Sequence, residues 1–384
     1  MNILILDRGS RGGQCGFPYH YCKLGHKVYM IKPGEKGFKW DQIPTWPRML
    51  MKNETLQLRN FEANEIPDYE NFSYGEDRFL QSQKEELLQN MYESDVSCEL
   101  ITLKDLELGK VKIDAVHTTD HCVGILDELL EFKKKYIPHS KWISSTFDPG
   151  SFRDGMPCGI IPDNVVRILP AIYENEFNNK NSCNFYRHPF EFELLGIDTK
   201  IKDKTKDFGS FNHNFSNRNP ELWKVFSNIS DFVKNNHGIN LENYGGNIRG
   251  QGADLKYDKN SGITGTLKTL SPRSAAEKFM NLRAVVHLKT QDWGGGVPAY
   301  ARFSGTPMIV LKGYLPNSKM DKIWKHGFNC FEISSPQELY EAILYLEQNP
   351  EIAKKLGENA QSLNSVLFSQ KYWDSWDKML KNLK

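Results

Sequence analysis

Segment 262–331 constrains the fold most, because short apolar runs alternate in it with helical stretches and glycine turns. The apolar run 284–288 follows a helical stretch at 271–282 and predicts a buried strand. After it come Gly294, Gly295 and Gly296, which let the backbone approach a ligand closely and adopt positive φ. A helix that starts after such a turn presents unpaired N–H groups and a positive dipole end to an anion. A triple glycine alone is also typical of a flexible loop.

The first thirty residues show the same alternation. An apolar run at 3–6 leads into the glycine-containing loop 9–16, then a helical stretch to about Lys23 and a second apolar run at 28–31. Strand, glycine loop, helix and strand make a βαβ unit, which builds a parallel sheet. The dinucleotide-binding fingerprint is not met, because its glycine spacing and its acid after the second strand are both missing. The loop is either a turn that faces a ligand or a tight turn that binds nothing.

Composition sets the outer limits. A chain of 384 residues with 39% apolar and 25% charged residues suggests two globular domains. Seven scattered cysteines without a C-x-x-C pair favour a reducing compartment over a disulfide framework or a zinc knuckle. The N-terminal strand is too short for a signal peptide, and no apolar run reaches the ~20 residues that cross a bilayer. We therefore expect a cytoplasmic protein without a transmembrane segment.

The net charge of +1 is unevenly distributed. Residues 1–60 hold ten Lys and Arg against four Asp and Glu, a difference of +6, and residues 61–105 hold three against twelve, a difference of −9. The basic opening could face an anionic ligand or acceptor, or could be an ordinary solvated surface. Aromatic residues interleaved with basic ones could hold an acceptor, or could pin a long loop to its own domain. The acceptor-binding candidates are Trp40, Trp46, Lys39 and Arg48.

Taken in order along the chain, these segments resemble the GT-B glycosyltransferases, including the retaining glycogen-synthase-like group. The resemblance implies an α/β fold in which two Rossmann-like, doubly wound domains face each other across a cleft. Residues 1–190 would form the acceptor-side domain, residues 191–364 the domain that binds the nucleotide sugar, and a C-terminal helix at 365–384 would pack back on the first domain. No D-x-D triplet occurs, so no metal is expected.

The resemblance also implies a donor site. The turn at Gly209 and Ser210 resembles the one that holds the donor diphosphate, with Arg218 as its charge partner, because a guanidinium fork matches phosphate oxygens. Many GT-B enzymes place two glutamates eight positions apart where this chain has Asp292 and Tyr300, so ribose recognition departs from their pattern. The donor-binding candidates are Gly12, Gly13, Gly209, Ser210, Arg218, Gly246, Arg249, Asp292, Gly294, Gly295 and Gly296.

Ionisable side chains follow two predicted strands of the first domain. Asp120 and His121 come shortly after the strand at 113–117, and Asp148 comes after the strand at 141–143. Ligands bind at the carboxyl ends of parallel strands, so these ends converge on one edge. Residues 140–148 resemble the part of phage DNA β-glucosyltransferases that carries the general base, with Asp148 at its position. Asp148 could instead start a turn before its proline, and His121 could cap or pack a helix.

The sequence thus predicts a hexosyltransferase that moves a sugar from a nucleotide diphosphate sugar to a hydroxyl acceptor. UDP-sugars are the expected donors, a glycan or another small molecule is the expected acceptor, and no further cofactor is expected. Three rivals are a DNA glucosyltransferase acting on a hydroxylated base, a non-catalytic GT-B module that binds a sugar nucleotide, and a sugar epimerase of the same fold. The sequence leaves the donor sugar, the anomeric outcome and the oligomeric state open.

Overall fold

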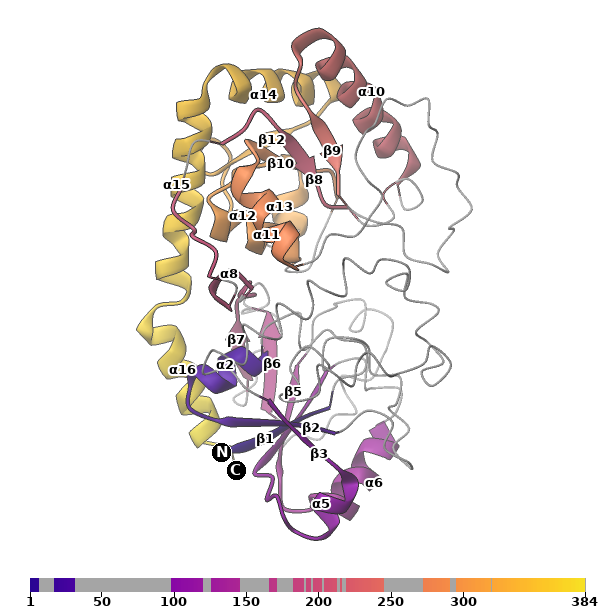
Figure 1. The fold of residues 1–384 in the computed structure, drawn as a ribbon, viewed down its shortest axis with the longest axis vertical. Helices are drawn as coiled ribbons and strands as arrows, with labels where there is room; N and C mark the ends of the chain where they lie inside the picture. The colour runs from indigo at the N-terminus through magenta and orange to yellow at the C-terminus, as the bar shows by residue number, and fades with distance from the viewer. Residues whose placement is uncertain are drawn as a thin grey trace. The chain divides into compact units, whose positions relative to one another are not determined.

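The computed structural model of the chain describes residues 1–6, 17–31, 98–119, 126–145, 166–170, 182–189, 191–194, 196–201, 204–212, 215, 219–244, 272–290, 295–318 and 320–383. They group into two compact units, both drawn in Figure 1. The first unit holds the described residues before position 190 together with those of Phe368–Lys384, and the second holds those of Glu191–Leu367.

The first unit is built on a parallel sheet of seven described strands, in the order β3-β2-β1-β4-β5-β6-β7. The chain starts in the middle at β1, builds outward through β2 and β3, and returns to the other side of β1 with β4, as in a doubly wound fold. The strands are β1 (Asn2–Leu6), β2 (Lys27–Ile31), β3 (Cys98–Ile101), β4 (Ala115–Thr119), β5 (Lys141–Ser145), β6 (Val166–Pro170) and β7 (Ser182–Phe185).

Helices cover both faces of this sheet. On one face, Phe17 and Tyr21 of α2 (Phe17–Lys23) pack on His117 of β4. On the other, α5 (Leu103–Glu107) and α6 (Leu126–Tyr136) close an apolar core with side chains of β1, β2, β4 and β5. β4 extends to Thr119, two residues beyond the predicted strand, so His117 lies inside the strand and not at its end.

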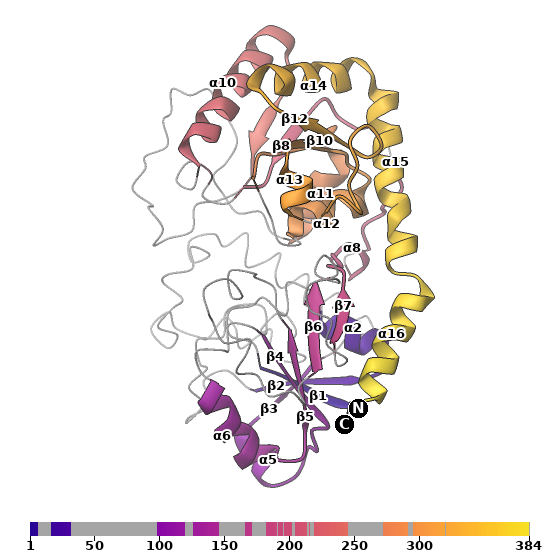
Figure 2. The same cartoon turned by 180° about the vertical axis from the view of Figure 1, so that it is seen from behind.

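Helix α16 (Gln370–Lys381) belongs to the first unit, although it lies at the far end of the chain. Its Trp376 is fully buried, with its ring 6.0 Å from that of Phe17. The Tyr372 hydroxyl lies 3.0 Å from Nε2 of His20 and accepts a hydrogen bond from the backbone N–H of Tyr186. Figure 2 shows α16 beside α2, so the last helix completes the layer on that face of the sheet.

The second unit has a smaller parallel sheet of five described strands, in the order β12-β11-β10-β8-β9. The first strand of this unit, β8, lies between β9 and β10, so the direction in which strands are added reverses between β8 and β10. This is the second common doubly wound order. The strands are β8 (Phe208–Ser210), β9 (Leu241–Asn243), β10 (Ala284–His287), β11 (Met308–Leu311) and β12 (Cys330–Ile333).

The core of the second unit joins β8, β10 and β11 to two long helices through Phe208, Val286 and Ile309, among others. Those helices contribute Phe226 of α10 and Ile343 of α14. The helices are α8 (Glu191–Leu194), α10 (Pro220–His237), α11 (Pro272–Asn281), α12 (Gly296–Ser304), α13 (Tyr314–Asn317), α14 (Pro336–Gln348) and α15 (Pro350–Leu367).

Helices α12 and α15 touch backbone to backbone. Gly305, which ends α12 in the left-handed region with φ 62°, lies directly against Gly357 of α15. A Cβ built on Gly357 would lie 2.0 Å from the Gly305 carbonyl oxygen, so only glycine fits at position 357 in this packing. Beside this contact, Nε of Arg302 donates to Oδ1 of Asn364 at 2.7 Å. Helix α15 thereby holds α12 in place against the sheet.

Candidate active site

The carboxyl ends of β8 and β10 flank the switch point of the second sheet, where doubly wound proteins bind ligands. Two segments of the predicted donor site lie there. Gly209 and Ser210 end β8, and Gly295 and Gly296 begin α12, the helix that follows β10. The fold therefore brings together two segments that are more than eighty residues apart in the sequence.

Among the described residues, no side chain caps the start of α12. Gly295 is its N-cap residue and has no side chain to offer, and the first turn contains no acidic residue. The backbone N–H groups of Gly296 and Val297 therefore face outward at the positive end of the helix dipole, an arrangement that suits a phosphate. Gly295 has φ −54°, which any residue adopts, so this glycine does not use its freedom to take a positive φ.

Packing accounts for the glycine at 209. A Cβ at Gly209 would lie 2.6 Å from Cδ1 of Leu282 and 2.9 Å from Cε2 of Tyr244, both of which are buried. These side chains occupy the volume that any larger residue at 209 would need. The predicted role of Gly209 in donor binding can therefore involve only its backbone.

Asparagine side chains fasten the ends of β8 and β9. The backbone N–H of Asn212 donates to Oδ1 of Asn243 at 3.2 Å, and Nδ2 of Asn243 donates back to the Asn212 carbonyl at 3.3 Å. Nδ2 of Asn212 donates to the hydroxyl of Ser210, which is fully buried, at 3.1 Å. Sequence reasoning missed Asn212 and Asn243. The available signal was one asparagine at or just after each of the segments that form β8 and β9.

Tyr300, which stands where many GT-B enzymes have a glutamate, packs between helices. Its ring lies 5.2 Å from that of Phe192 in α8 and 5.3 Å from that of Phe279 in α11. These contacts link α12, through Tyr300, to two neighbouring helices. They agree with the expectation that a tyrosine here does not replace a ribose-binding carboxylate.

A partly buried lysine links α11 and α12. Nζ of Lys204 donates to the carbonyls of Phe279 and Ser304, at 3.3 and 3.1 Å, and to the hydroxyl of Thr306 at 2.9 Å. The two carbonyls belong to the last turns of α11 and α12, where the helix dipole favours a cation. Burial acts in the opposite direction and lowers the pKa of Lys204 to about 7.

In the first unit, β4 and β5 are adjacent and parallel, and their last residues, Thr119 and Ser145, are partners in the register. Asp120 and His121 follow directly after Thr119, and Asp148 follows three residues after Ser145. These three residues lie outside the described part of the chain, and so do many donor and acceptor candidates, whose roles stay predictions. Those candidates are Gly12, Gly13, Arg218, Gly246, Arg249, Asp292, Gly294, Trp40, Trp46, Lys39 and Arg48.

A buried polar chain that sequence reasoning missed lies beneath these strand ends. The hydroxyl of Tyr21 is 2.7 Å from Nδ1 of His117, and Nε2 of His117 is 2.8 Å from the hydroxyl of Ser145. Burial lowers the pKa of His117 to about 3, so its ring is neutral at physiological pH. A histidine within an apolar strand was the only signal in the sequence.

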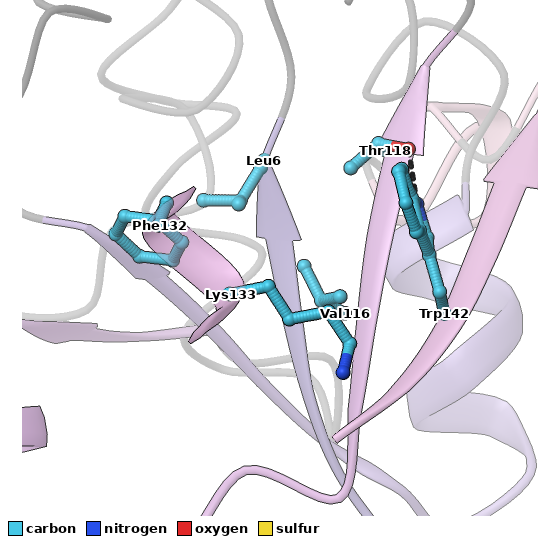
Figure 3. Close-up of a pocket in the computed structure, with 6 residues that line it drawn as sticks. All are labelled: Leu6, Val116, Thr118, Phe132, Lys133 and Trp142. Atoms are coloured by element: carbon cyan, nitrogen blue, oxygen red, sulfur yellow. Dashed lines mark hydrogen bonds between the residues drawn. The ribbon is translucent and has the colours of Figure 1, made fainter. Parts of the chain in front are cut away.

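The opposite face of β4 lines a small pocket (Figure 3). Four of its six lining side chains are apolar or aromatic, and the Thr118 hydroxyl already accepts a hydrogen bond from Nε1 of Trp142 at 2.8 Å. A nucleotide site needs several converging polar groups. The other polar group, the Lys133 ammonium, already donates to the Pro138 carbonyl at 3.1 Å, so this pocket is a gap in the core beneath α6. The lining residues are Leu6, Val116, Thr118, Phe132, Lys133 and Trp142.

No protein-family model and no curated protein match the sequence, whereas solved structures match the fold. HepE of Anabaena, crystallised in complex with UDP and with UDP-glucose, has a TM-score of 0.57 at 11% and 13% identity. The match covers 99% of this chain and 100% or 99% of HepE. A glycosyltransferase from Rickettsia africae has a TM-score of 0.53 at 11% identity over 99% of this chain and 98% of its own.

TarM of S. aureus is matched over 72% of this chain at 17% identity with a TM-score of 0.46. The match covers 56% of TarM, so this chain spans little more than half of that protein. The full-length matches and the two parallel sheets show that the chain has the two-domain, Rossmann-like fold of the GT-B glycosyltransferase superfamily, which confirms the predicted fold class. Among the described helices, none is long and apolar enough to cross a membrane.

Proposed function

We propose that this chain is a glycosyltransferase that takes a sugar from a nucleotide diphosphate sugar. The observation that carries the proposal is the uncapped start of α12 at the switch point of the second sheet, on the same edge as Gly209 and Ser210. Such a helix start suits the charge of a diphosphate. HepE shares the fold over its whole length and has been crystallised with UDP-glucose, so UDP-sugars are the donors to test first.

In the proposed reaction, separate groups of residues act on the donor and on the acceptor. The N–H groups of Gly296 and Val297, together with Arg218, would hold the diphosphate and stabilise the charge that grows on it as the glycosidic bond breaks. In an inverting reaction, Asp148 would take the proton of the acceptor hydroxyl as its oxygen attacks the anomeric carbon. The proposed acceptor is a glycan or another small molecule with a free hydroxyl.

Replacing Gly295 with aspartate tests the donor site directly. The N-cap backbone at φ −54° and ψ 158° accepts any residue, and aspartate is a preferred N-cap. Gly295→Asp should therefore fold at least as stably as the wild type, yet its carboxylate would occupy and repel the diphosphate position. We expect an affinity for UDP at least ~10-fold weaker by calorimetry, equivalent to the ~1.4 kcal/mol of one repulsive contact.

Gly295→Ala is the matched control, because it adds a methyl group without charge. It should keep UDP affinity within about twofold, since it neither caps the helix nor repels an anion. If Gly295→Asp bound UDP as tightly as Gly295→Ala, the start of α12 would not be the diphosphate site. Turnover of UDP-sugars with a panel of hydroxyl acceptors then separates an enzyme from a module that only binds the sugar nucleotide.

A DNA acceptor is the second candidate, because residues 1–60 carry a charge difference of +6 from ten basic and four acidic residues. Binding to duplex DNA would then weaken steeply with salt, with a slope near −0.9 for each phosphate contact. Alanine at the four basic positions should abolish such binding, and a small acceptor would show a much shallower salt dependence. The four positions are Lys36, Lys39, Arg48 and Lys52.

A further inference from the structure

Three fully buried side chains tie helix α2 to the middle of β4 and to the end of β5. Tyr21 of α2 contacts Nδ1 of His117, and Nε2 of His117 contacts Ser145, the last residue of β5. His117 pairs with Ile143 in the register, so Ser145 is its diagonal neighbour on the same face of the sheet. We refer to these three residues as the buried relay.

The chemistry of the three side chains favours one direction for the two hydrogen bonds of the buried relay. A neutral imidazole has one nitrogen that donates and one that accepts. A phenol is a stronger donor than an aliphatic hydroxyl, which favours the tautomer in which Tyr21 donates to Nδ1 of His117 and the Nε2–H donates to Ser145. Both ring nitrogens are thereby satisfied, and the serine hydroxyl is oriented by the ring.

Stability alone does not require a histidine at this position. Apolar side chains at 21, 117 and 145 together would avoid burying these polar groups, and the side chain at 117 could still pack against Phe17, whose ring lies 4.7 Å away. What the histidine adds is a directional contact to the end of β5. Asp148 follows three residues after the end of β5.

We propose that His117 is a positioning residue, which fixes the end of β5 against β4 and α2 through Ser145 and Tyr21 and so places Asp148, the residue proposed to act on the acceptor. The proposal rests on the proposed glycosyltransferase function for its effect on rate. Small displacements of a catalytic group cost large factors in rate, about 100-fold for 1 Å, without changing ligand affinity elsewhere. The expected signature is therefore a loss of kcat with unchanged binding of the donor.

Ser145→Ala and Thr118→Val form a matched pair for testing this. Each removes one hydroxyl that is hydrogen-bonded to a ring nitrogen and that links β4 to β5. Residues 117 and 118 point to opposite faces of the sheet, so only Ser145→Ala touches the buried relay. The Thr118 bond reaches Trp142 near the start of β5, whereas the His117 bond reaches its end.

The kinetic arm measures kcat, donor KM and the Kd of UDP. Ser145→Ala should lower kcat at least ~10-fold with the Kd of UDP within about twofold, whereas Thr118→Val should keep kcat within about threefold. His117→Gln, which keeps one donor and one acceptor, should retain more kcat than His117→Leu, which leaves the hydroxyls of Tyr21 and Ser145 without this partner. Equal losses in Ser145→Ala and Thr118→Val, or wild-type kcat in Ser145→Ala, would overturn the proposal.

Hydrogen exchange supplies an arm that needs no turnover. The backbone amides of Ser144 and Ser145 should exchange at least ~10-fold faster in Ser145→Ala than in Thr118→Val, because only the former frees the end of β5. Equal exchange in the two variants would show that the buried relay does not hold the strand end. A wild-type protein that neither binds UDP nor transfers sugar would refute the proposed function, while the exchange comparison would still decide this proposal.

Discussion

Gly357→Ala should destabilise the second unit, although helix propensity alone predicts the opposite. Alanine inside a helix is favoured over glycine by ~1 kcal/mol. The added Cβ, however, would lie 2.0 Å from the carbonyl oxygen of Gly305 and 2.8 Å from its carbonyl carbon. Both groups are backbone, so no side-chain rotation relieves the clash, and the helices must separate by about 1 Å to reach ordinary contact distances.

Overpacking of this kind costs ~1–3 kcal/mol or more, and a clash with backbone belongs at the upper end. Subtracting the propensity gain leaves a net loss of ~2 kcal/mol in the free energy of unfolding. Urea unfolding followed by circular dichroism measures this, with Glu358→Ala, an exposed neighbour in α15, as the control that should change stability by less than ~0.5 kcal/mol. A Gly357→Ala protein as stable as the wild type, or more stable, would refute the packing argument.

Three further predictions address the proposed site and its supports. Asp148→Asn should leave folding and UDP binding intact and lower the rate of sugar transfer by ~100-fold or more. Turnover at the wild-type rate would mean that Asp148 is not the base and would make His121 or Asp120 the next candidates. Arg218→Ala should weaken UDP by ~2 kcal/mol and leave uridine affinity unchanged in calorimetry, whereas equal losses for both ligands would make it a surface residue. For Lys204, burial lowers the pKa in the folded state to about 7 from the usual 10.5, so between these values the unfolded chain holds a proton that the folded chain has lost. The free energy of unfolding therefore gains a rising contribution from pH 7 to 10, which Lys204→Met should remove in urea unfolding across that range; parallel pH profiles for the two proteins would contradict this.

Strands with an uninterrupted apolar run could be predicted from the sequence. β1 and β10 are fully or almost fully buried, so their residues read as continuous hydrophobic segments that end at glycines or charges. β3 and α5 were missed, because β3 has four residues including a glutamate and α5 has five. The capping box of Thr102 and Asp105 was a readable signal for α5, since each side chain accepts from the other's backbone N–H.

The site was predictable where it depends on local order and not where it depends on distant contacts. The glycines at the start of α12 could be placed because they follow a strong strand signal. His117 could not be recognised as part of a polar chain, because its partners lie 96 and 28 positions away. Likewise, the sequence alone suggests that Gly357 weakens its helix, and only the structure shows that the helix packs against Gly305 at this position.

The place of α16 has a consequence for how the protein is made. Domains generally fold from the N-terminus during synthesis, at about 5–20 residues per second. Here the first unit lacks the buried Trp376, and its partners Phe17 and Tyr21 stay uncovered, until α16 has left the ribosome. The second unit is complete in sequence at Leu367 and can fold before the first one is closed. A stop codon placed before α16 would therefore damage the unit that contains β1.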